Sequence, residues 1–153
     1  MSVSNVKQRQ AEGKIDRASQ AEKALVKPLG GWVSAFQEAI GMSASALAGR
    51  VGISRNNVYS AIKNEQSGSI SLNQLEKMAD AMGGKLVYAI IPRQGKVDDI
   101  IMAQARKKAK RIIQRTRAHM ALEEQIEGLR SQEEMIEELA REIAREMPRD
   151  FWK

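Results

Sequence analysis

The sequence predicts a mainly α fold, in which a five-helix, helix-turn-helix domain is followed by one β-strand and a helical C-terminal extension. Apolar residues recur at helical spacing in most segments of the chain. Aromatic residues make up only 4% of a composition with 3 prolines and many alanine, glutamate, lysine and arginine residues. Two short helical patterns, separated by one glycine-containing turn, lie between residues 43 and 64.

The composition also limits the classes of function. The chain has no cysteine, which excludes disulfides and cysteine-based metal sites or nucleophiles, and His119 is its single histidine. The sequence contains no phosphate-binding glycine-rich loop, no membrane-length apolar run and no signal peptide. We therefore expect a cytoplasmic protein that is not an enzyme and that needs no metal or cofactor. The net charge of +6 favours a polyanionic partner.

The first two segments are predicted to be helices. Residues 1–29 are a polar N-terminal segment whose helix ends before Pro28, because proline cannot continue a helix. Residues 32–40 form a short helix, and we expect its aromatic residues to anchor the small core. The apolar positions of the two segments are Ile15, Ala18, Ala21 and Leu25, followed by Trp32, Val33, Phe36 and Ile40.

Residues 43–64 have the spacing of a helix-turn-helix. Ser43 and Ser54 are each suited to cap the helix that follows. Gly52 stands where the first helix should end, since glycine tolerates the positive φ of a sharp turn, and Ile53 follows as an apolar turn residue. The inward residues at helical spacing are Ala44, Leu47, Ala48, Val51, Val58, Ala61 and Ile62.

The outward residues of this motif favour duplex DNA as the ligand. Arginine pairs with guanine and asparagine with adenine, and a recognition helix presents its first turn to base edges in the major groove. We expect Arg55, Asn56, Asn57 and Tyr59 to read bases, and Ser43, Arg50, Ser54, Ser60 and Lys63 to hold phosphates. The alternative is a helical hairpin without a ligand, whose outward residues are simply solvated.

One helix and one strand are predicted next. Ser71 caps a helix over residues 72–82, with Leu72, Leu75, Met78, Ala79 and Met82 facing inward. The β-branched and aromatic residues of 85–91, which end at Pro92, predict a strand. The chain has no obvious second strand, and an unpaired apolar strand is a liability. We therefore expect this strand to pair with its copy in a homodimer, which would suit an inverted-repeat operator.

The last two helices have opposite charge. Residues 98–122 carry seven basic and two acidic residues and begin a helix that extends to about residue 126, whereas residues 123–153 carry ten acidic and five basic residues. The basic helix is either solvated around a packing stripe (Ile101, Ala105, Ala109, Ile112, Ile113, Met120) or an extra phosphate contact. The acidic helix over 132–147 has Ile136, Leu139, Ala140, Ile143 and Met147 on one face. Phe151 and Trp152 are expected to be docked.

These patterns divide the chain into four parts. Residues 1–29 are the polar N-terminal helix, and residues 30–84 are the helix-turn-helix DNA-binding domain. Residues 85–92 are the strand with its dimer contact, and residues 93–153 are the C-terminal helical extension, which is first basic and then acidic.

The chain resembles the mobile mystery protein A family. The residues that carry the resemblance are GGWVSAFQEAIGMS (30–43), ISLNQLEKMADAMGGKLVYAIIP (70–92), ARKKA (105–109), HMALEEQ (119–125) and PRDFW (148–152). The resemblance covers the chain from about residue 15 onward, and the helix-turn-helix itself is shared with the wider Xre/Cro/CI class.

The resemblance implies a regulator of prokaryotic mobile elements, associated with the nucleoid when bound to DNA. Such proteins usually accompany a Fic-domain protein, mobile mystery protein B, so the resemblance implies an antitoxin and autorepressor. Inhibitors of Fic proteins often carry Ser/Thr-x-x-x-Glu-Gly/Asn, but here Glu123 stands four residues before Glu127-Gly128. One alternative is an interaction module that neutralises a Fic enzyme and binds DNA only incidentally. Another is a regulator of element transfer without a toxin partner.

Overall fold

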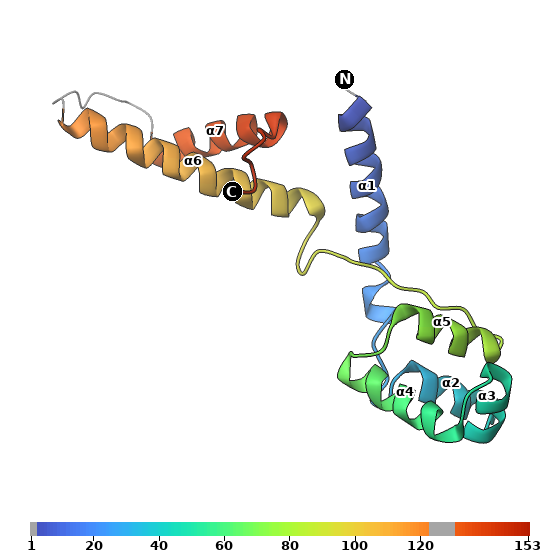
Figure 1. The fold of residues 1–153 in the computed structure, drawn as a ribbon. Helices are drawn as coiled ribbons and strands as arrows, with labels where there is room; N and C mark the ends of the chain where they lie inside the picture. The colour runs from blue at the N-terminus through green and yellow to red at the C-terminus, as the bar shows by residue number, and fades with distance from the viewer. Residues whose placement is uncertain (1–2, 123–130) are drawn as a thin grey trace. The chain divides into compact units, whose positions relative to one another are not determined.

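The computed structural model describes residues 3–122 and 131–153, and in these ranges the chain forms α-helices and one short 3-10 helix (Figure 1). The chain divides into two compact units. Unit 2 comprises residues 21–89, and unit 1 combines the N-terminal segment up to Gln20 with the chain from Ile90 onward. Each unit has its own hydrophobic core, so the two are described separately.

Unit 2 consists of short helices packed around one small core. Its elements are η1 (Glu22–Ala24), α2 (Trp32–Ile40), α3 (Ala44–Val51), α4 (Arg55–Ser67) and α5 (Leu72–Ala81). The core is formed by Val33, Leu47, Ala48, Val58, Ala61, Met78 and Met82, which come from α2, α3, α4 and the end of α5. The helical class and the pair α3 and α4 thus agree with the sequence analysis.

Three serine caps predicted from the sequence are confirmed. The hydroxyl oxygens of Ser43, Ser54 and Ser71 each accept a hydrogen bond from the backbone N–H three residues later, at 3.1 Å. Each bond satisfies one of the N–H groups that the first turn of a helix leaves unpaired. The limits of α3, α4 and α5 are therefore set by residues adjacent in sequence.

A fourth cap comes from a distant residue. Glu65, on the last turns of α4, is buried, and its carboxylate accepts hydrogen bonds from the backbone N–H groups of Trp32 at 2.6 Å and Val33 at 3.1 Å. Gly31 precedes them with φ of 88°, and a Cβ there would lie 2.7 Å from Oε2 of Glu65. Lys27 Nζ donates to the carbonyl oxygen of Glu65 at 2.7 Å. The carboxylate thus fastens α4 to the positive end of α2.

The expectation that the aromatic residues of α2 anchor the core is wrong. Trp32 and Phe36 are 47% and 40% exposed, and Ile40 is exposed as well. Val33 and Gln37, one position further along the helix, face the core instead. Leu72, expected to face inward on α5, is also exposed. Helical spacing places residues on a common face, but which face is buried depends on the neighbouring helices.

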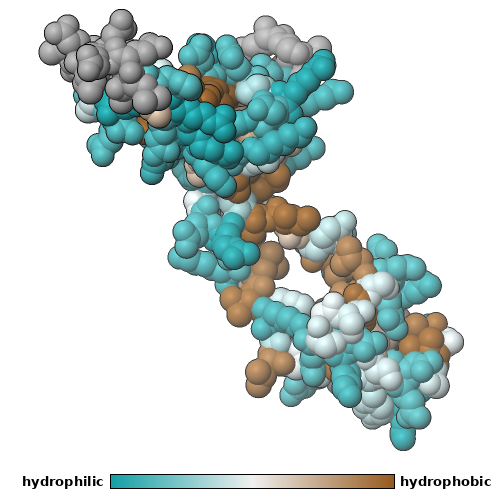
Figure 2. All heavy atoms as spheres, turned by 60° about the vertical axis from the view of Figure 1, so that its left-hand side comes forward, coloured by the Kyte–Doolittle hydropathy of each residue, from teal (hydrophilic) through white to brown (hydrophobic). Residues whose placement is uncertain are grey.

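The predicted strand over residues 85–91 is also wrong. The segment has no regular secondary structure, and no strand occurs in the described ranges of the chain. A β-ladder requires a second strand to accept and donate its backbone hydrogen bonds, and nothing in residues 3–122 or 131–153 supplies one. The segment therefore leaves apolar side chains in solvent, with Tyr88 at 68% and Ile90 at 87% exposure. Figure 2 shows hydrophobic side chains breaking the otherwise hydrophilic surface.

Unit 1 is built on an antiparallel pair of helices. It contains α1 (Val3–Ser19), α6 (Val97–Leu122) and α7 (Gln132–Glu146). The shorter helix α7 packs against α6. Its core comprises Ile101, Ala105, Ala109, Ala140, Ile143 and Phe151. Ile112, expected in the packing stripe of α6, is exposed. The side chain of Met120, also expected there, lies outside the described residues, as do Glu123, Glu127 and Gly128.

Polar contacts fix the C-terminal residues and α7 on α6. Lys108 Nζ forms a 2.8 Å ion pair with Asp150 and also donates to the carbonyl oxygen of that residue. Gln104 donates to the carbonyl oxygen of Phe151 at 2.6 Å. Phe151 is docked as predicted, but Trp152, which meets it edge to face, is 60% exposed. The hydrogen bond from Lys108 holds the pKa of Asp150 below its usual value.

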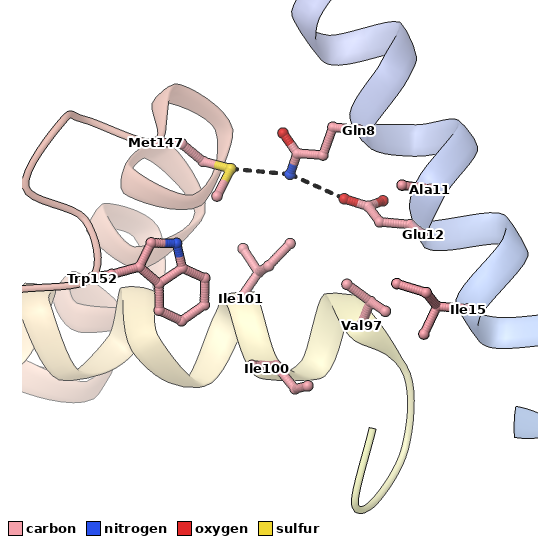
Figure 3. Close-up of a pocket in the computed structure, with 9 residues that line it drawn as sticks. All are labelled: Gln8, Ala11, Glu12, Ile15, Val97, Ile100, Ile101, Met147 and Trp152. Atoms are coloured by element: carbon pink, nitrogen blue, oxygen red, sulfur yellow. Dashed lines mark hydrogen bonds between the residues drawn. The ribbon is translucent and has the colours of Figure 1, made fainter. Parts of the chain in front are cut away.

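A shallow, open cavity lies between α1 and the α6–α7 pair in unit 1 (Figure 3). Its wall is mostly apolar, with Val97, Ile101 and Trp152 on one side, and Gln8 on α1 donates to the sulfur of Met147 at 3.1 Å across it. No group of metal-ligating side chains occurs in the described residues. Within the same ranges, no helix has the length and apolar character that crossing a membrane requires.

Replacing Glu65 with alanine should destabilise unit 2. The variant leaves the N–H groups of Trp32 and Val33 buried or half-buried without their partner, which should lower the free energy of unfolding by about 2–3 kcal/mol. Urea unfolding followed by circular dichroism measures this change. Glu76→Ala, which removes an exposed carboxylate from α5, is the control and should change stability by less than about 0.5 kcal/mol. Equal effects of the two variants would contradict the assigned role of Glu65.

Candidate nucleic-acid interface

The α3–turn–α4 segment forms a tight corner with the geometry of a helix-turn-helix. Gly52 ends α3 with φ of 82°, and the N–H groups of Gly52 and Ile53 both donate to the carbonyl oxygen of Ala48, at 2.9 and 3.0 Å. Ala48 is buried, and its small side chain allows the two helices to approach closely. Leu47 and Val58 fill the corner and are completely buried. The direction of α4 relative to α3 is therefore fixed by core packing.

The first turn of α4 presents three side chains to solvent. Arg55, Asn56 and Asn57 are all exposed, while Val58 directly after them is buried. Tyr59 lies in the next turn and is also exposed. The guanidinium and amide groups form no side-chain hydrogen bond with the described residues. They are therefore free to pair with the edges of bases, as the first turn of a recognition helix does.

A polar stripe continues along α4. Asn56, Ser60 and Lys63 follow one another at spacings of four and three residues, so they share the face opposite Val58 and Ala61. All three are exposed. Glu65, the single acidic residue of α4, is buried on the core side. The outward face of α4 thus carries only positive charge, from Arg55 and Lys63, which suits a polyanion.

The remaining residues expected to hold phosphates lie at the edges of this face. Ser43 and Ser54 accept capping bonds through their hydroxyl oxygens, and each hydroxyl keeps its proton for an anionic oxygen. Arg50 is exposed at the end of α3, but one of its nitrogens donates to the carbonyl oxygen of Ala81 at 3.4 Å. Arg50 is thus partly occupied by the fold, although its other donors are available.

Sequence reasoning missed the residues that hold α4 in place. Glu65 caps α2, and its neighbour Gln66 donates through Nε2 to the carbonyl oxygen of Gly30 at 3.1 Å. Together these contacts connect the last turns of α4 to the chain before α2. The signal in the sequence was weak, because a glutamate near the C-terminal end of a helix is expected to be solvated. Its negative charge there is unfavourable to the helix dipole.

The comparisons with known proteins agree with this geometry. Residues 38–86 match the family model of the Cro/C1-type HTH DNA-binding domain, a range that begins near the end of α2 and includes α3, α4 and α5. Searches of curated proteins and of solved structures gave no match to the chain. The chain contains a Cro/C1-type helix-turn-helix DNA-binding domain, whose matched range includes α3 and α4.

Proposed function

We propose that the protein is a sequence-specific transcriptional regulator, without catalytic activity, that binds an inverted-repeat operator and represses its own operon in the cytoplasm. The observation that carries this proposal is the exposure of Arg55, Asn56 and Asn57 in the first turn of α4, within a domain of the Cro/C1 type. Side chains that could read bases stand there without internal partners, on a helix whose orientation the core fixes.

Different residues of the α3–turn–α4 segment are proposed to read bases and to bind phosphates. Arg55, Asn56, Asn57 and Tyr59 are the residues proposed to read bases, because hydrogen bonds to base edges carry sequence information. Ser43, Arg50, Ser54, Ser60 and Lys63 are proposed to contact phosphates, which set register and orientation but not sequence.

Substitution of Asn56 or Arg55 by alanine should lower the preference of the protein for its operator over other DNA sequences. Each variant should weaken binding to the operator by about 1–3 kcal/mol and leave binding to a scrambled duplex nearly unchanged. Fluorescence anisotropy with DNA from upstream of the gene and with its scrambled version measures both affinities. Asn73→Ala, an exposed amide on α5, is the control and should change neither. Equal losses on the two duplexes would show phosphate contacts instead of base reading.

We propose further that the protein acts as a homodimer through the apolar surface of unit 2. Val87 and Tyr88 are exposed after α5, and Trp32, Phe36 and Ile40 form a half-exposed stripe on α2. Five large apolar side chains on one small unit favour burial against another protein surface. A second copy is the occupant best suited to DNA, since a two-fold dimer presents two α4 helices to the two halves of an inverted repeat.

The variant Tyr88→Asp should separate the dimer, because a charge in a buried apolar interface is not solvated. Sedimentation equilibrium should then report a monomer at concentrations where the unaltered protein is a dimer. Ile112→Asp introduces the same charge at an exposed position of α6 and should leave the dimer intact. A monomeric unaltered protein would overturn the proposal.

A second candidate function is the restraint of a Fic-domain protein, which rests on the resemblance to mobile mystery protein A. Trp152 favours it, since this residue is 60% exposed at the wall of the open cavity, beside the anchored Phe151. Exposed aromatic residues of this kind are common anchors of protein interfaces. The acidic residues of α7 would surround this contact with negative charge.

Co-purification tests this second function. A tagged Fic-domain protein from the neighbouring gene should retain the unaltered chain and lose most of the Trp152→Ala variant. Tyr59→Ala, which removes an exposed aromatic residue from the DNA-binding unit, should be retained as well as the unaltered chain. Deleting residues 131–153 is a poorer test, because it would uncover the apolar face of α6.

A further inference from the structure

The DNA-binding unit has little net positive charge of its own. Residues 21–89 carry seven lysine and arginine residues against five acidic ones. Two of the seven, Lys27 and Arg50, donate to backbone carbonyl groups within the unit. Neutralisation of phosphates supplies much of the affinity of proteins for DNA. Another part of the chain is therefore a candidate source of phosphate contacts.

The strongest run of positive charge lies on α6. Residues 106–117 contain seven basic residues and no acidic residue. Docking of the C-terminal segment uses three of them: Arg106 pairs with Glu137 at 2.6 Å, Lys108 with Asp150, and Arg117 donates to Gln132. The hydrogen bond from Arg106 lowers the pKa of Glu137, as expected for a carboxylate held by a cation.

The other four basic residues are not used in this docking. Lys107, Lys110, Arg111 and Arg115 are exposed and form no hydrogen bond or ion pair with the residues that the structure describes. The packing of Ala105 and Ala109 into the core of unit 1 places Lys107 on the opposite side of the helix, with Arg111 four residues later on the same face and Lys110 at its flank. In the view of Figure 2, hydrophilic side chains cover most of this unit.

The arrangement of these four cations differs from an ordinary solvated helix. On α7, Arg141 and Arg145 each have a glutamate three residues earlier, so each of these cations has an opposite charge at helical spacing. On α6, Lys107, Arg111 and Arg115 follow one another at a spacing of four residues, a pattern in which like charges repel and destabilise the helix. A bound polyanion relieves this repulsion. The four residues span roughly 12 Å of helix, comparable with about three phosphates along one DNA strand.

We propose that this outward face of α6, defined by Lys107, Lys110, Arg111 and Arg115, is a second DNA-binding surface that contacts phosphates without reading sequence. The inference rests on the proposed function of α4, since both surfaces bind one duplex. The segment that joins α5 to α6 tethers the two surfaces, so that binding of one raises the effective concentration of the other.

The test compares two variants that each remove two positive charges from unit 1. Lys107→Gln/Arg111→Gln neutralises the proposed surface, and Arg141→Gln/Arg145→Gln neutralises exposed arginines among the glutamates of α7. Glutamine keeps the helix propensity of both sites. Affinities for operator and scrambled duplexes are measured by anisotropy over a series of salt concentrations.

The α6 variant should lose affinity for both duplexes by the same factor. Its slope of log affinity against log salt should become shallower by about 2 per protomer, since each neutralised phosphate contributes about 0.9. The ratio of operator to scrambled affinity should stay constant. The α7 variant should bind DNA as the unaltered protein does, and thermal unfolding should show that neither variant is appreciably less stable than the unaltered protein.

Three outcomes would overturn the proposal. An unchanged salt slope in the α6 variant would show that this face does not contact DNA. Loss of Fic-protein binding with full retention of DNA binding would make the face a protein interface. Equal losses in the α6 and α7 variants would show only an effect of net charge. Failure of α4 is distinguishable, because Asn56→Ala would then leave the operator preference intact while the α6 variant still weakened both duplexes.

Discussion

The buried carboxylate of Glu65 holds together the unit that carries the candidate interface. A charged side chain in a small core needs strong partners, because burial of an unpaired charge is costly. Glu65 finds them in the N–H groups of Trp32 and Val33, which the first turn of α2 leaves without acceptors. One contact therefore satisfies a buried charge and a helix terminus together. It also fixes the far end of α4, whose near end is held by the cap at Ser54.

The rigidity of α4 matters for the proposed base reading. Side chains that pair with bases must be held at a defined angle to the groove, and a helix fixed at both ends supplies that angle. The core residues Val58 and Ala61 face one way, so that Asn56, Ser60 and Lys63 must face the other. The division between core and interface on α4 thus follows from helical geometry once one face is buried.

In unit 1, docking of the C-terminal segment on α6 divides the basic residues of that helix into paired ones and ones that are unpaired within the described part of the chain. Seven basic residues occur between positions 106 and 117. The C-terminal segment engages Arg106, Lys108 and Arg117 and leaves the other four exposed to solvent. Phe151 anchors that segment in the core, so the closing residues of the chain help to define the charged surface of α6. The proposed phosphate contacts are a consequence of this packing.

The sequence by itself determined the features that depend on near neighbours. The caps at Ser43, Ser54 and Ser71 and the turn at Gly52 could be predicted, because the hydrogen bonds and backbone angles involved join residues a few positions apart. The exposed residues at the start of α4 followed from the same local periodicity.

Only the tertiary structure decided which contacts form between distant residues. Spacing alone placed Trp32 and Phe36 on one face of α2, but the packing of α4 and α5 determined that Val33 is the buried neighbour. Residues 85–91 have the composition of a strand, yet no partner within the described chain pairs with them. Glu65 gave no local signal, because its two partners lie more than thirty positions earlier. Burial and strand pairing each require contact between two segments of the chain. The sequence of one segment therefore shows only which residues it can offer to such a contact.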